Sequence, residues 1–162
     1  MKCLWLLPVA LLATPAAAVS PREEVEAFNE RFAAVTRQMD NAGAMALWAE
    51  DGVSLLPEMA PMQGRARIAK FLDEVTSLMK GWRVISHESA CHDIDVSGDR
   101  ASEWCETHQV VQPSGGLPRI DIHGKMLLVL RKGGDGAWRL QSEMWNRSPS
   151  PDGAPSATER KP

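Results

Sequence analysis

Residues 50–65 read EDGVSLLPEMAPMQGR, and this stretch decides the fold. Its apolar run, residues 53–56, is typical of a buried strand, and Pro57 and Pro61 then enforce a loop. A segment with helical periodicity begins at Arg65. We expect this strand and loop to line a cavity, so the chemistry of the run matters. Residues 53–56 carry no carboxylate, and the cavity wall they form is therefore apolar.

Helical patterns stand on both sides of this stretch. Ser20, Pro21 and Glu23 form a helix start with a capping box, and apolar residues then recur at three- and four-residue steps as far as Met39. A short second helix is predicted over residues 44–50, and a third over 65–79.

The second half of the chain has the period of strands. Turn residues separate four strand-like segments, at 82–96, 100–112, 120–130 and 138–145. Helices first and hairpin-linked strands later predict an α+β fold with a curved antiparallel sheet.

The ends of the chain differ from this domain. Residues 1–18 have an early lysine, an apolar run and the small residues 16–18, which predicts a cleaved signal peptide. We therefore expect a periplasmic or secreted protein with no membrane span after cleavage. The domain is predicted over residues 19–147, and the Pro/Ser-rich tail, 148–162, is predicted to be disordered.

The charge pattern excludes one class of function. The formal net charge is −3, and no basic run of the kind that follows a phosphate backbone is present. Nucleic-acid binding is not expected.

Four segments in sequence carry a resemblance to a known family: ALWAEDGVSLL (46–56), MQGRARIAKFL (62–72), VSGDRASEW (96–104) and GAWRLQSEMWN (136–146). Over residues 22–147 the chain resembles the NTF2-like superfamily, in its DUF4440 or SnoaL-like branch, which is related to ketosteroid isomerase. The resemblance implies an NTF2-like cone, in which the curved antiparallel sheet is wrapped around the three N-terminal helices and is open at one end to an apolar pocket. It also implies a homodimer formed through the sheet.

The same resemblance argues against isomerase chemistry. Ketosteroid isomerase uses an Asp base and an oxyanion hole made by a Tyr and a protonated Asp. The positions that resemble these three hold Leu56, Phe32 and Leu128, and the chain contains no tyrosine. Leucine and phenylalanine neither transfer protons nor stabilise an enolate.

We therefore predict an exported protein that binds a small apolar or amphipathic ligand in the cone, without isomerase activity and without a cofactor or metal ion. The predicted pocket residues are Phe32, Leu56, Met62, Leu128, Glu143 and Trp145.

Two other functions stay open. One is an enzyme, a lyase, hydrolase or isomerase, that uses other residues such as Glu143 or His108. The other is a protein-interaction module that uses the sheet face.

The cysteines allow two arrangements. A three-residue loop over 97–99 sets Cys91 opposite Cys105 and permits a disulfide, whereas a two-residue turn at Gly98 and Asp99 places them on opposite faces. A zinc site built from these cysteines with His87 and His108 is not expected, because Cys105 and His108 have opposite strand parity.

Overall fold

The computed structural model describes residues 18–151, which contain three helices and six strands. The helices are α1 (Pro21–Gln38), α2 (Asn41–Leu47) and α3 (Arg65–Leu78). The strands are β1 (Trp48–Leu55), β2 (Met62–Gln63), β3 (Arg83–Ser97), β4 (Arg100–Gln112), β5 (Ile120–Lys132) and β6 (Trp138–Arg147). The predicted signal peptide, apart from Ala18, and the tail beyond residue 151 lie outside the described residues.

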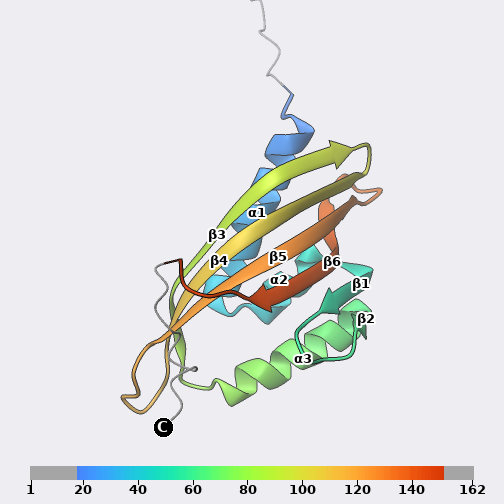
Figure 1. The fold of residues 1–162 in the computed structure, drawn as a ribbon. Helices are drawn as coiled ribbons and strands as arrows, with labels where there is room; N and C mark the ends of the chain where they lie inside the picture. The colour runs from blue at the N-terminus through green and yellow to red at the C-terminus, as the bar shows by residue number, and fades with distance from the viewer. Residues whose placement is uncertain (1–17, 152–162) are drawn as a thin grey trace, which may run out of the picture.

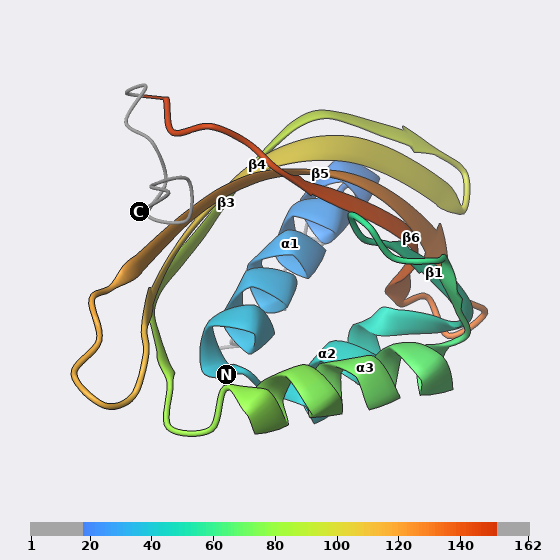
Figure 2. The same cartoon turned by 60° about the horizontal axis from the view of Figure 1, so that its bottom comes forward.

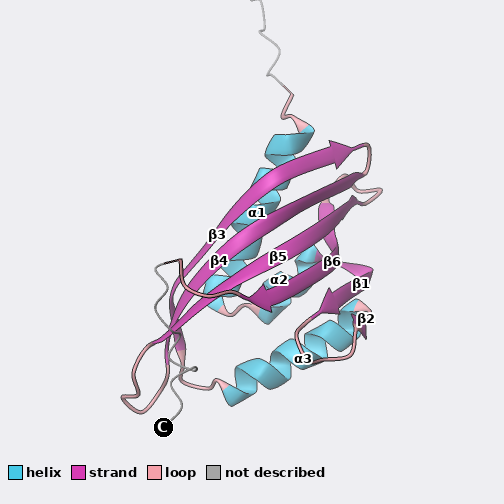
Figure 3. Ribbon diagram, in the orientation of Figure 1, coloured by secondary structure: helices cyan, strands magenta, loops and turns pink. Residues whose placement is uncertain are grey.

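The strands form one curved sheet in the order β2-β1-β6-β5-β4-β3 (Figure 1). The long strands β3, β4 and β5 arch over α1, and α2 and α3 lie below the arch, so that all three helices lie on the concave side (Figure 2). The predicted α+β fold is confirmed. Among the described strands the pairing is antiparallel except between β1 and β6, which run parallel and join the two halves of the chain (Figure 3).

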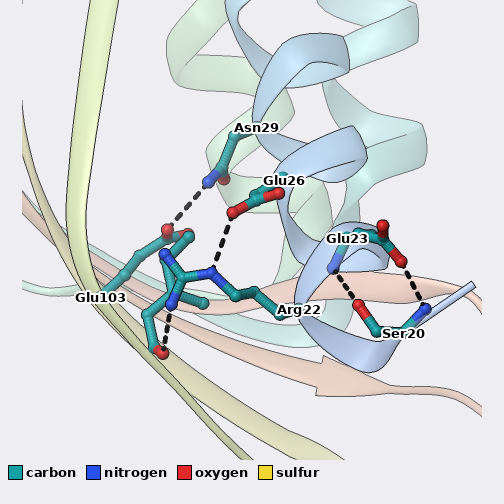
Figure 4. Close-up of polar contacts among 7 residues, drawn as sticks. Ser20, Arg22, Glu23, Glu26, Asn29 and Glu103 are labelled. Atoms are coloured by element: carbon teal, nitrogen blue, oxygen red, sulfur yellow. Dashed lines mark hydrogen bonds and ion pairs between the residues drawn. The ribbon is translucent and has the colours of Figure 1, made fainter.

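The start of α1 follows the predicted chemistry. Ser20 Oγ accepts a hydrogen bond from the Glu23 backbone N–H at 3.2 Å, and the Glu23 carboxylate accepts one from the Ser20 N–H at 2.7 Å (Figure 4). Both donors would otherwise lack a partner at the helix start. One turn on, Glu24 accepts hydrogen bonds from Lys132 and from the indole of Trp138, which fixes α1 against the sheet.

The second helix was predicted too late in the chain. It ends at Leu47, and Trp48, which the helical interpretation included, already belongs to β1. The reason is packing: Trp48 is buried in the core, and its ring lies against Gly52, where an added Cβ would come within 2.7 Å of it. Burial of this tryptophan therefore outweighs the weak helical signal of residues 44–50.

The β3–β4 hairpin contains both a two-residue turn and a disulfide, which could not occur together if the two strands paired without a bulge. Ser97 pairs with Arg100, which leaves the two-residue turn, yet Cys91 and Cys105 are also paired and form a disulfide. A bulge between His92 and Asp95 shifts the register by one residue and brings the cysteines to one face. Within the bulge Asp93 has φ +51°, and its carboxylate accepts a hydrogen bond from the Trp104 indole at 2.7 Å.

One ionisable side chain lies deep beneath α1. Glu103 is 2% exposed, and its Oε2 accepts a hydrogen bond from Asn29 Nδ2 at 2.8 Å (Figure 4). Glu103 Oε1 and Asn29 Oδ1 are both buried and have no hydrogen-bond partner within residues 18–151. Burial raises the pKa of the Glu103 carboxyl, with smaller opposing effects from Asn29 and Arg22. A proton on this carboxyl would let it donate to the Asn29 oxygen and satisfy both atoms.

Within residues 18–151 no helix combines the length and apolar character that crossing a bilayer requires.

Replacing Glu103 by Gln should stabilise the protein at alkaline pH. The amide can both donate to and accept from Asn29, whereas the ionised carboxylate can only accept. A raised folded-state pKa means that the cost of ionisation is absent at low pH and fully present above that pKa. At pH 8 we expect a gain of about 1 kcal/mol, or roughly 2–8 °C in Tm, that disappears near pH 4.

Thermal melts at both pH values measure this difference. Glu106→Gln is the matched control, because Glu106 lies on the same strand with an exposed side chain. Equal Tm changes for the two variants at pH 8 would contradict the expectation.

Candidate functional site

A cavity of about 420 Å³ lies between the concave face of the sheet and the helices. Its wall is mainly apolar, with side chains from α1, α2, α3 and five of the strands. Apolar residues that line it include Phe32, Val35, Met39, Leu56, Phe71, Leu72, Val75, Ile122, Met126 and Trp145. This size and composition are typical of a pocket for a small organic molecule.

Strand β1 and the residue after it contribute to the wall as strand alternation requires. Ser54 and Leu56, two residues apart, both reach the cavity, and Ser54 is buried. The apolar run of residues 53–56 thus supplies one hydroxyl and one leucine side chain to the wall.

A bulge in β6 turns Glu143 and Trp145 toward the cavity. Leu130 pairs with Leu140 and Val129 with Ser142, so Gln141 is the extra residue. Before the bulge Trp138 and Leu140 point into the core; after it, the odd-numbered residues do. Strict alternation along the whole strand would place Arg139 on the same face as Glu143 and Trp145. Arg139 instead forms an ion pair with Asp135 on the surface.

Glu143 is the acidic side chain of the wall opposite the helices. It lies between Ser54 on β1 and Leu128 on β5, and the carboxylate makes no hydrogen bond or ion pair with any residue from 18 to 151. Desolvation in this half-buried position raises the pKa of Glu143 to about 7. A carboxyl of this kind can donate or accept a proton near neutral pH.

His87 adds a second polar group. It is buried, and its Nδ1 lies 3.1 Å from Gln109 Oε1, an acceptor, so Nδ1 carries the proton. Burial lowers the pKa of His87, and the charge of Arg37 lowers it further, which keeps the ring neutral at pH 7. Its Nε2 is then an acceptor, buried in the cavity wall without a partner in the described chain.

The Trp145 indole lies over Gly124 of β5 and beside Thr107 of β4. Its Nε1 donates to Thr107 Oγ1 at 3.4 Å. A Cβ at Gly124 would lie 2.5 Å from that nitrogen, so only glycine leaves room for the ring. Gly124 therefore sets the depth of this side of the cavity.

Four of the six predicted pocket residues line the cavity: Phe32, Leu56, Glu143 and Trp145. The other two lie in the core instead. Leu128 is covered by the side chains around α1, and Met62 is buried on the short edge strand β2, next to α3.

His108 lies away from the cavity. Its parity places it on the outer face of the sheet, beside Asp121. The sequence analysis did not predict that His87, Gln109 and Thr107 line the cavity. All three have odd residue numbers on the adjacent strands β3 and β4, and this alternation was the one sequence feature that could have placed them on the cavity side.

Comparison with known proteins agrees with this architecture. The family model for the SnoaL-like domain matches residues 17–143. No curated protein matches the chain.

Solved structures with the same fold share little sequence with the chain. A ketosteroid isomerase-like protein from Erwinia carotovora atroseptica has a TM-score of 0.67 at 18% identity, covering 78% of this chain and 96% of its own. A candidate scytalone dehydratase from Novosphingobium aromaticivorans has a TM-score of 0.68 at 16% identity, with coverages of 78% and 83%. An NTF2-like protein with a cystatin-like fold, also from Novosphingobium aromaticivorans, has a TM-score of 0.62 at 26% identity and covers 86% of each chain.

The Glu143 carboxyl should titrate with a midpoint near pH 7. Carbon-13 NMR of the glutamate side-chain carboxyls, followed from pH 4 to 9, measures it directly. The resonance should vanish in Glu143→Gln and persist in Glu58→Gln, which removes an exposed carboxyl of the loop after β1. A spectrum in which every glutamate titrates below pH 5 would contradict the assignment.

Proposed function

The chain belongs to the family of SnoaL-like domains, and from this premise we propose that its cavity binds one small, mainly apolar molecule that presents a single polar group to Glu143. The observation that carries the proposal is the cavity of about 420 Å³ with an apolar wall and one unpartnered carboxyl. Apolar area supplies the affinity of such a site, and the few polar groups set the orientation of the ligand.

Ketosteroid isomerase activity is not part of the proposal. Phe32 and Leu56 line the cavity, and Leu128 lies beside Glu143 in the sheet, with no proton-transferring group on any of the three. Loss of a general base alone typically reduces a rate by about 10²–10⁴-fold, and loss of oxyanion donors reduces it further.

A second candidate function is acid–base catalysis on the bound molecule. The observation in its favour is the pairing of Glu143, with a pKa of about 7, with the buried acceptor Nε2 of His87 in one cavity. Such a pair could move a proton between two positions of a substrate, as a lyase or isomerase does. The neighbour named as a candidate dehydratase is consistent with this class of reaction, at an identity that establishes the fold alone. Glu143→Gln separates the two functions, because it should abolish turnover while leaving apolar binding largely intact.

We also propose export to the periplasm or beyond. Cleavage after Ala18 would leave the capping box at Ser20 and Glu23 complete, and the Cys91–Cys105 disulfide suits an oxidising compartment. The intact mass of the exported protein should correspond to a chain that begins at Val19.

Two substitutions should weaken binding in the cavity. Burial of one leucine and one tryptophan face contributes on the order of 2–4 kcal/mol, equivalent to about 30–1,000-fold in Kd. With 2-naphthol as the probe, an apolar bicycle with one hydroxyl, we expect Trp145→Ala to lose part of this affinity. Leu56→Asp should lose most of it, because it introduces a buried charge.

Isothermal calorimetry measures both affinities, with circular dichroism to verify folding. Leu117→Asp, which changes an exposed leucine outside the cavity, is the control and should bind as the parent protein does. Unchanged affinity in both pocket variants would place the binding site elsewhere.

The outer face of the sheet suits a homodimer. Trp104, Leu127 and Met144 are 40%, 49% and 44% exposed and lie in register across β4, β5 and β6. No described helix covers this convex face (Figure 2). We propose that a second copy of the chain covers it.

Replacing Leu127 by Glu should therefore convert the dimer to a monomer, because the new charge would lie in the middle of the apolar row. Sedimentation velocity of the two proteins, with Leu117→Glu as an exposed control, gives the oligomeric state. A parent protein that sediments as a monomer would refute the dimer.

A further inference from the structure

Three metal-binding side chains converge on the outer face of the sheet, away from the cavity. Asp121 Oδ1 lies 2.8 Å from His108 Nε2 and 3.2 Å from His123 Nε2. The two imidazole rings are stacked with 4.3 Å between centroids and 2° between planes. All three ligand atoms lie within 4.8 Å of one another.

The strand register creates this cluster. His108 on β4 and His123 on β5 are directly paired, so their side chains stand side by side on one face. Asp121 precedes His123 by two residues and therefore points to the same face. The cluster accordingly belongs to two rigid neighbouring strands and not to a loop, which favours a defined ligand geometry.

We propose that His108, His123 and Asp121 bind a divalent transition-metal ion of the zinc type, through both Nε2 atoms and Oδ1. In a tetrahedral site with bonds of about 2.0–2.1 Å, ligand atoms are separated by roughly 3.3 Å. The two distances from Asp121 are close to that value, whereas the parallel rings direct their nitrogens side by side, so both imidazoles must rotate before the nitrogens converge on one ion. Imidazole nitrogen selects Zn²⁺, Ni²⁺ and Cu²⁺ over Mg²⁺ or Ca²⁺.

Exposure and ligand number define the kind of site. The side chains of His108, His123 and Asp121 are 37%, 20% and 57% exposed in the single chain, so an ion can reach them from solvent. His108 and His123 lie four residues along their strands from Trp104 and Leu127 of the proposed dimer surface. Three protein ligands leave at least one coordination position for water or for a donor from another molecule. This arrangement is an open site, unlike the four-ligand sites that hold small domains together.

The other candidate clusters in the described chain are less suitable. Cys91 and Cys105 lie near Glu103, but their sulfurs are joined in the disulfide and offer no thiolate. His92 and Glu106 form a pair, 3.3 Å apart, with only two ligands. The chain has four histidines, and the fourth, His87, lies in the cavity wall.

Calorimetric titration of tag-free, EDTA-treated protein with Zn²⁺ alone tests the proposal. We expect saturable binding of one ion per chain, a ratio that holds for monomer or dimer. Even an outer-shell partner of a metal site typically contributes about 10–100-fold in affinity. His123→Gln and Asp121→Asn, which each remove a direct ligand, should therefore weaken binding at least about tenfold. His92→Gln removes an outer-face histidine outside the cluster and should bind as the parent does.

Thermal melts give a second readout. Saturating Zn²⁺ should raise the Tm of the parent and of His92→Gln, but not that of His123→Gln, since an ion that binds only the folded state stabilises it. All four proteins should give the same circular dichroism spectrum in EDTA, because the substituted side chains lie on the surface. The proposal is overturned by the absence of saturable binding. It is equally overturned if His92→Gln weakens binding as much as His123→Gln does.

Discussion

Successive residues of a strand point to opposite faces of the sheet, and one inserted residue reverses every side chain that follows it. The cavity depends on this constraint. The extra residue Gln141 in β6 moves the inward set from Trp138 and Leu140 to Glu143 and Trp145. Without that bulge, Ser142 and Met144 would face the helices and the carboxyl would lie on the outer surface. A single backbone irregularity thus gives the cavity its acidic group.

The position of the Glu143 carboxyl in the cavity wall costs folding free energy. Ionising a carboxyl whose pKa is raised by burial costs free energy, so the destabilisation by Glu143 grows as the pH rises from its ordinary pKa to about 7 and is fully present above that pH. His87 Nε2 is buried and has no hydrogen-bond partner among the described residues. Two unsatisfied polar groups in one apolar cavity are unusual in a site that is only a core. A ligand with a hydroxyl or carbonyl would satisfy them, which connects the cost in stability to the proposed binding function.

The sequence predicted the elements well because their signals are local. The capping box at Ser20, the turn residues 97–99, and the apolar run from Val53 to Leu56 each depend on residues a few positions apart. The bulges were not predictable, since Asp93 and Gln141 carry no local signal for an inserted residue. That is why the turn and the Cys91–Cys105 bond, which looked incompatible, occur together. The contact between His108 and His123 was not predictable for a similar reason. It depends on the register of β4 with β5, which is not encoded by residues a few positions apart.

The parallel pairing of β1 with β6 has a consequence for when the fold can form. These strands are separated by most of the domain, and β1 has only the two-residue β2 as its other neighbour in the sheet. Closing so long a loop is slow, and the pairing cannot begin until the last strand has been synthesised. The core around Trp48 therefore cannot close before β6 is available. Apolar surface of the helices and of β1 therefore stays uncovered until β6 pairs, and the interval before that step is when the chain is most exposed to misassembly.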